Sequence, residues 1–131
     1  MSGPTYTLDR TRMHIRPGVT IEVEIAETEE SRAKAPVDQI SLSAACGLLL
    51  AFGNPQPGRF STEGMKMDVD VVWLDRLTVV GVASGLRAPI GVQRASTSLS
   101  PVPVTELLLL PSGAAAELGI VQGQKFKVDR G

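Results

Sequence analysis

Two aspartates, Asp68 and Asp70, have the spacing that could most directly support chemistry. In an extended strand, residues i and i+2 share one face, so their carboxylates would lie side by side, with Glu63 a short distance upstream. Carboxylate oxygens are the ligands that Mg²⁺ and Ca²⁺ take, and a desolvated carboxyl group can act as a general acid or base. The spacing supports the hypothesis of a divalent-cation site at Asp68 and Asp70, and of a metal-assisted hydrolase built on it.

A solvated acidic sheet face is the simpler interpretation of the same pair. Glu22 and Glu24 repeat the i, i+2 spacing within an alternating strand pattern. Sites for hard cations usually recruit more than two side chains from converging elements. We therefore predict no cofactor and keep the divalent cation as the weaker alternative.

The chain offers few other groups for catalysis. It has one histidine, His14, and one cysteine, Cys46, so a Ser-His-Asp or Cys-His mechanism would have to use His14. A single cysteine excludes an intramolecular disulfide. The sequence contains no phosphate-binding glycine motif and no HExxH motif. The sequence therefore disfavours an enzyme and leaves the metal-assisted hydrolase as an alternative.

The overall composition is that of one ordinary soluble domain. The chain has 131 residues, of which 43% are apolar and 21% charged. A net charge of −1 and an aromatic content of 4% provide neither the positive field nor the stacking platforms of nucleic-acid-binding proteins. No apolar run approaches the roughly 20 residues of a membrane span, and the N-terminus lacks the apolar stretch of a signal peptide. We expect no nucleic acid, no membrane and a cytoplasmic location.

The carboxylate pair lies in the stretch that most strongly predicts a hairpin, residues 67–84. Apolar residues alternate up to Leu74, and a β-branched run resumes at Leu77. A two-residue turn at Asp75 and Arg76 would place Val72 opposite Val79 and Trp73 opposite Thr78.

The remaining elements are short strands separated by Gly and Pro turns. Strands are expected at residues 19–25, 48–52, 104–110 and 125–128. A helix over residues 28–34 would begin at the N-cap Thr28 and end before Pro36, and a second, over 112–118, would be capped by Ser112. The pattern predicts an all-β, β-dominated single domain, barrel-like or a bent sandwich, mostly antiparallel, with two short helices.

Residues 1–18 are expected to form an N-terminal arm or an edge strand, and residues 19–131 the β domain. The first segment carries Arg10, Arg12 and Arg16, a small basic group that could meet an acidic partner.

Two Gly- and Pro-rich segments, residues 53–58 and 85–103, are expected to edge a binding groove. The side chains assigned to this groove are Asp68, Asp70, Phe60, Glu63, Asn54 and Arg94. Its ligand would be a small molecule or a protein. The alternative is a structural accessory protein whose exposed strand edges pair with a partner or with a second copy as a homodimer.

Several segments together resemble the DUF192 family, small β-rich bacterial and archaeal domains of undefined function. Residues 108–120, LLLPSGAAAELGI, are similar to the family's leucine-rich strand, Pro-x-Gly turn and Ala-x-x-Leu-Gly-Ile helix end. Residues 47–52, GLLLAF, resemble its Gly-Met-Leu-Phe-x-Phe strand. Arg32 lies where the family carries an arginine-rich helix end, and Phe60, Asp70 and Asp75 match its Phe…Leu-Asp…Asp spacing. The resemblance spans residues 19–128 and implies a β-rich domain without a known activity.

The departures from the family pattern fall at four places. They are Ser61-Thr62-Glu63 for the family's Trp-Met-Lys, Asp68 for its proline, Ala35-Pro36-Val37 for its Gly-Leu-Met, and Gln124 for the aspartate of its closing turn. If those family positions line a shared site, this chain has rebuilt or lost it.

Overall fold

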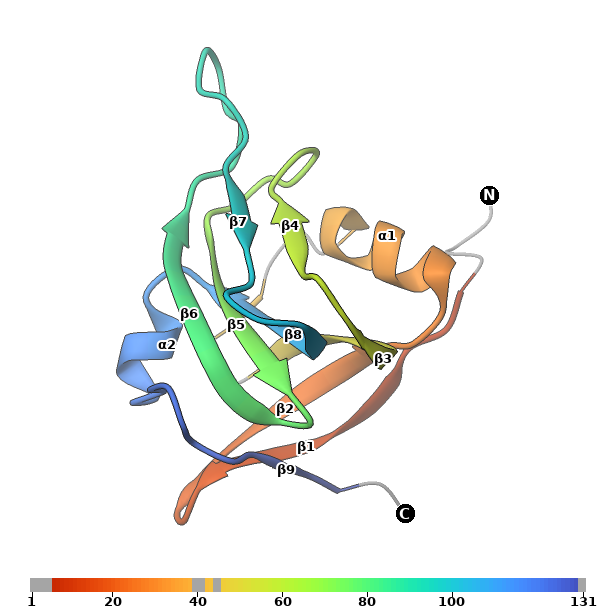
Figure 1. Ribbon diagram of the computed structural model, residues 1–131. Helices are drawn as coiled ribbons and strands as arrows, with labels where there is room; N and C mark the ends of the chain where they lie inside the picture. Colours follow the sequence, from red (N-terminus) through yellow and green to blue (C-terminus); the bar gives the residue numbers. More distant parts are fainter. Residues whose placement is uncertain (1–5, 39–41, 44–45, 130–131) are drawn as a thin grey trace.

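The computed structural model describes residues 6–38, 42–43 and 46–129 (Figure 1). Strands predominate in this part of the chain and two short helices accompany them, which confirms the expected all-β class. The strands are β1 (Asp9–Arg16), β2 (Val19–Ala26), β3 (Cys46–Gln56), β4 (Arg59–Ser61), β5 (Val69–Asp75), β6 (Thr78–Leu86), β7 (Thr97–Leu99), β8 (Val104–Pro111) and β9 (Lys127–Val128), and the helices are α1 (Glu29–Asp38) and α2 (Ala114–Glu117).

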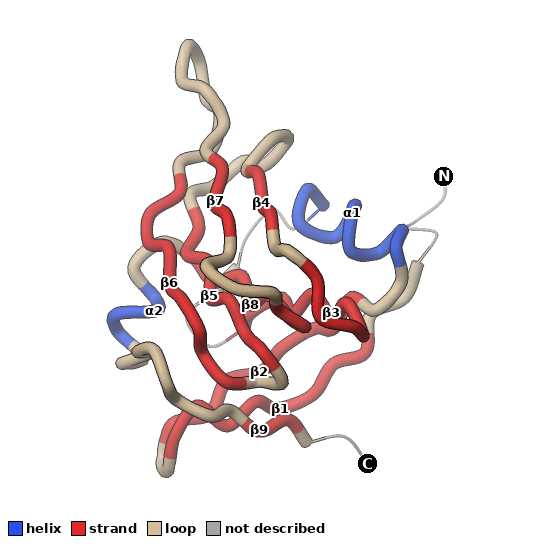
Figure 2. Tube along the Cα trace, in the orientation of Figure 1, coloured by secondary structure: helices blue, strands red, loops and turns tan. Residues whose placement is uncertain are grey.

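Seven strands form one curled sheet in the order β6-β5-β8-β3-β2-β1-β9, and β4 pairs with β7 in a separate small sheet (Figures 1 and 2). Neighbours in the large sheet are antiparallel except β2 and β3, which run parallel because the connection through α1 crosses over between them. The two edges of the sheet are linked by the chain before β9. There the N–H groups of Gly123 and Phe126 donate to the carbonyls of Val79 and Leu77. The described strands do not close into a barrel, so the fold is the bent sandwich.

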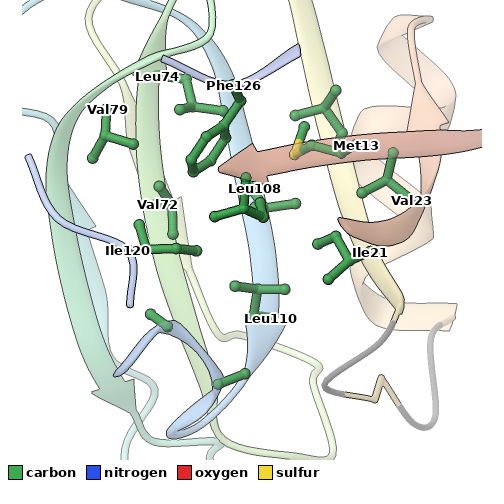
Figure 3. Close-up of a cluster of buried hydrophobic side chains, with 14 of the residues drawn as sticks. Met13, Ile21, Val23, Val72, Leu74, Val79, Leu108, Leu110, Ile120 and Phe126 are labelled. Atoms are coloured by element: carbon green, nitrogen blue, oxygen red, sulfur yellow. The ribbon is translucent and has the colours of Figure 1, made fainter. Parts of the chain in front are cut away.

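Two apolar clusters lie on the two faces of the large sheet. The first lies inside the bend, where β1 and β2 face β5, β6 and β8 (Figure 3). Its largest fully buried members include Met13, Ile15, Leu74, Leu108, Leu110 and Phe126. The second lies on the opposite face and contains Leu48, Leu50, Phe60, Met65, Val69, Val71, Trp73, Val104, Leu107 and Leu109. Residues of β5 alternate between the two clusters, as period-2 side chains must when both faces are buried.

The β4–β7 sheet covers Trp73 on the second face. The Trp73 indole Nε1–H donates to Ser98 Oγ at 3.2 Å, and Gly58 N–H donates to Ser100 Oγ at 2.8 Å. A Cβ placed on Gly58 would lie 2.5 Å from the Trp73 ring. Glycine is therefore required here by the close approach of the backbone to the indole.

The β5–β6 hairpin exists, but its predicted register is wrong. The turn consists of Arg76 and Leu77, with Asp75 opposite Thr78, and irregularities further along place Val72 opposite Val82. Both turn residues have positive φ, 49° and 66°, a conformation that non-glycine side chains rarely adopt. Their N–H groups donate to Thr105 Oγ1 (2.7 Å) and Glu106 Oε1 (3.0 Å) on β8. These tertiary hydrogen bonds stabilise the turn in the absence of glycine.

The first helix extends beyond its predicted end. Thr28 precedes it as expected, and Thr28 Oγ1 accepts from Ser31 N–H at 3.0 Å. The prediction that Pro36 ends the helix is wrong, because α1 continues to Asp38 with Pro36 inside it. Pro36 is buried beside Ala35, so packing offsets the hydrogen bond that proline cannot donate.

Residues 9–16 form strand β1 rather than a loose arm, and Met13 and Ile15 are buried in the first cluster. The strand β3 continues through the predicted loop to Gln56, with an irregular register after Ala51. Residues 97–99, expected within a loop, form β7.

We predict that Gly58→Ala lowers the free energy of unfolding by about 1–3 kcal/mol, the usual cost of overpacking a filled core. Urea unfolding followed by the fluorescence of Trp73, the only tryptophan, measures this directly. Gln56→Ala, an exposed change two residues earlier, is the control and is expected to stay within about 0.5 kcal/mol of wild type. Equal stability of the two variants would contradict the close packing of Gly58 on the indole.

Candidate functional site

Asp70 is a fully buried carboxylate that accepts three backbone hydrogen bonds. Its Oδ1 accepts from Gly85 N–H at 2.8 Å, and its Oδ2 accepts from Gly113 N–H and Ala115 N–H, both at 3.0 Å. Gly113 is the N-cap of α2, has φ 94°, and has no side-chain cap of its own. The prediction that Ser112 caps this helix is therefore wrong: Asp70, far away in sequence, satisfies the N-terminal N–H groups of α2.

Asp68 is exposed, and its carboxylate also accepts a hydrogen bond from the backbone. Its Oδ1 accepts from Ala88 N–H at 2.9 Å, and its carbonyl accepts from Ser112 N–H. Because Asp70 is inaccessible and both of its oxygens are occupied by N–H donors, a cation could meet only the exposed Asp68 without breaking the structure.

The other side chains assigned to the predicted groove do not gather around these aspartates. Phe60 is packed in the second cluster, on the opposite sheet face from Asp70. Glu63, Asn54 and Arg94 are exposed on three different parts of the chain: the β4–β5 connection, the end of β3 and the β6–β7 connection. The two segments expected to edge a groove are hydrogen-bonded to each other at Gly58 and Ser100, next to the β4–β7 sheet. No group of three or more His, Cys, Asp or Glu side chains suited to a metal occurs in the described part of the chain.

A groove of about 700 Å³ lies at the end of the sheet where the β1–β2 turn meets the C-terminal segment. We call it the terminal groove. Its accessible apolar surface comes from Leu77 and Val128, and Ile15 and Phe126 of the first cluster lie buried behind them. The volume falls in the range of about 300–1,000 Å³ found for small-molecule sites. The terminal groove is lined by His14, Ile15, Arg16, Pro17, Gly18, Leu77, Lys125, Phe126, Lys127, Val128 and Asp129.

The rim of the terminal groove is cationic. Arg16, Lys125 and Lys127 line it, and within the described residues none of them forms an ion pair with an acid. The single acid in the lining, Asp129, lies 3.0 Å from His14 Nε2. The Arg16 guanidinium rests against Gly119, where an added Cβ would lie 3.1 Å from it. In a protein of net charge −1, three cations against one acid among the described lining residues make this end locally positive.

Sequence reasoning identified Arg16 only as part of a basic segment and missed the terminal groove. Lys125 and Lys127 alternate with Phe126 and Val128, a signal for a strand with one charged face. The groove itself forms only because β9 pairs with β1, which joins the two ends of the chain.

Cys46 lies in the lining of a neighbouring depression with Arg10 and Arg12. Burial raises the pKa of its thiol above the ordinary value, although Arg10 acts in the opposite direction. A raised pKa keeps the thiol protonated at neutral pH, so this side chain is a poor nucleophile.

Comparison with known proteins shows one family and two structural relatives. The model of the DUF192 family, described as "Uncharacterized ACR", matches residues 11–128. A Sinorhizobium meliloti protein provisionally named a transcription regulator superposes with a TM-score of 0.80 at 18% identity, covering 95% of this chain and 98% of the other. A Novosphingobium aromaticivorans protein of unknown function gives 0.78 at 19% identity, covering 92% of this chain and 84% of the other. At these identities, the likeness concerns the fold. No curated protein matches the sequence.

None of the described helices is long and apolar enough to cross a membrane.

The divalent-cation hypothesis stays a prediction, and thermal unfolding with Mg²⁺, Ca²⁺ or EDTA tests it. We expect no shift of the Tm at millimolar cation, because Asp70 is engaged by backbone N–H groups and Asp68 alone offers too few ligands. A cation-specific rise of the Tm that Asp68→Ala abolishes would contradict this expectation and reopen the hydrolase hypothesis. Asp75→Ala, which removes a carboxylate from the far end of β5, is the matched control.

Proposed function

Because the chain belongs to the DUF192 family, for which no activity is defined, we propose its function from the site itself: a non-enzymatic binding domain whose terminal groove holds a small anionic ligand with an apolar body. The observation that carries the proposal is the combination of an apolar floor with three cations on one rim that form no ion pair with any described acid.

The chemistry of the terminal groove defines the ligand class. Leu77 and Val128 offer apolar surface that a hydrocarbon group would bury, which favours binding in proportion to the area covered. Arg16 can give a carboxylate or phosphate two parallel hydrogen bonds, whereas Lys127 supplies a mobile point charge. Lys125 is partly committed, since its Nζ donates to the Arg76 carbonyl at 2.7 Å. An amphiphilic monoanion satisfies both parts of the groove.

Binding rather than catalysis is supported by what the groove contains. Its lining has one His–Asp pair, His14 and Asp129, and no serine, threonine or cysteine side chain. The cysteine lies elsewhere and has a raised pKa. We further propose a cytoplasmic protein that does not bind nucleic acid. The net charge of −1 supports the second point, because nucleic-acid binding draws on a broad positive surface.

We predict that octanoate perturbs backbone amide chemical shifts at residues 14–18 and 125–129 in ¹⁵N-correlated NMR spectra, whereas octanol at equal concentration binds at least 10-fold more weakly. Double substitution Arg16→Glu/Lys127→Glu should weaken octanoate binding by at least 10-fold, because it reverses two of the three rim charges.

Lys66→Glu, a reversal of an exposed lysine outside the terminal groove, is the matched control and should bind like wild type. Perturbations distributed over the whole surface, or equal weakening by Lys66→Glu, would refute the terminal groove as the site.

A further inference from the structure

The connection between β6 and β7 projects from the body of the protein and ends in exposed aliphatic side chains. Figures 1 and 2 show residues 87–96 as a loop extending beyond both sheets. At its tip, Val92 is 104% exposed and Ile90 62% exposed. We call residues 87–96 the projecting loop. Large aliphatic side chains that are exposed to solvent and packed against no core indicate a surface that another molecule covers.

The base of the projecting loop is held by a buried polar centre. Thr62, which is fully buried, donates through Oγ1 to the Arg87 carbonyl at 2.7 Å and accepts from Ser96 N–H at 2.8 Å. Ser96 Oγ accepts from Arg87 N–H, and Asp68 accepts from the N–H of the buried Ala88. Both arms of the loop are thus hydrogen-bonded to each other and to the connection between β4 and β5.

The tip is also ordered by its own hydrogen bonds. Gln93 Nε2 donates to the Ala88 carbonyl at 2.7 Å, and Gln93 N–H donates to the Ile90 carbonyl. A loop already held in one shape loses little conformational entropy on binding, so its exposed side chains can contribute more of their contact energy to affinity.

The projecting loop carries only positive charges. From Leu77 to Thr105 the sequence has no Asp or Glu, and its charged residues are Arg87 and Arg94. Both arginines are exposed and flank the aliphatic tip. The rest of the molecule carries the excess of acids, because the whole chain has a net charge of −1.

We propose that the projecting loop docks into a partner protein whose surface offers an apolar pocket rimmed by carboxylates. Val92 and Ile90 fill the pocket, and Arg87 and Arg94 meet the rim. Arginine is enriched at protein–protein binding centres, and the aliphatic tip supplies apolar area that a complementary pocket can bury. An anionic membrane is disfavoured, because surface adsorption relies on clusters of about four to eight cations, and this loop has two and no aromatic side chain.

The test replaces Val92 with a photoreactive amino acid in the full chain expressed in its own cells. A second version carries the same group in place of Val121, which is 59% exposed and lies outside the loop. We expect a protein adduct at position 92 that is absent at position 121. No adduct at 92, the same adducts at both positions, or adducts with lipid or with a second copy of the chain would overturn the proposal.

The captured protein is then purified, and its affinity for the full chain is measured by titration calorimetry. Val92→Asp and the double change Arg87→Glu/Arg94→Glu should each weaken binding by at least about 10-fold, while Val121→Asp leaves it unchanged. Reversing rim carboxylates on the partner to lysine should restore binding to the arginine-reversed chain. Affinity unaffected by Val92→Asp would overturn the proposal. Urea midpoints of all variants, read by Trp73 fluorescence, exclude unfolding as the cause.

Discussion

A buried carboxylate holds three distant parts of this fold together. Asp70 lies on β5, yet the N–H groups that donate hydrogen bonds to it belong to the end of β6 and to the start of α2. A charged group without water must be compensated by hydrogen bonds, and here three backbone donors supply them. In return, Asp70 satisfies N–H groups that a four-residue helix, with no side-chain cap of its own, would otherwise leave without partners. The helix, the end of β6 and the first apolar cluster therefore depend on one side chain.

This contact joins two of the segments through which the chain resembles its family. The Leu-Asp position, occupied by Asp70, touches the Pro-x-Gly turn at Gly113. Arg32 behaves similarly: its Nη1 donates to the Ala51 carbonyl at 3.0 Å and its guanidinium lies over the Phe52 ring. Both pairs join two of the matching segments, so these shared residues stabilise the fold. The family's Trp-Met-Lys positions are different. In this chain the corresponding residues include Thr62, whose hydroxyl is hydrogen-bonded to both ends of the projecting loop. The departure from the family pattern at Thr62 therefore affects a surface loop.

Local patterns were sufficient to predict the strands and the β-dominated class, because alternation and apolar runs report burial directly. They failed where distant contacts decide the structure. The turn at Arg76 and Leu77 takes positive φ with the help of Thr105 and Glu106, some 29 residues away. The cap of α2 is 45 residues from Ala115. The prediction that Asp68 and Asp70 share a strand is correct for Asp70, whereas Asp68 lies one residue before β5. Spacing alone cannot tell a ligand-binding carboxylate from one that accepts backbone N–H groups. The terminal groove is lined by residues 14–18 and 125–129, which lie far apart in the sequence, so no short stretch of sequence contains both.

The most direct test of this account is the free energy of unfolding of Asp70→Asn, measured by urea titration beside Asp75→Asn. The amide would present an NH₂ group to N–H donors and remove the charge that strengthens their hydrogen bonds. We expect a loss of about 3 kcal/mol or more for Asp70→Asn, and about 0.5 kcal/mol or less for Asp75→Asn, the same substitution on the same strand at a half-buried position. Comparable stability of the two variants would contradict the role of Asp70 as the group on which this fold depends.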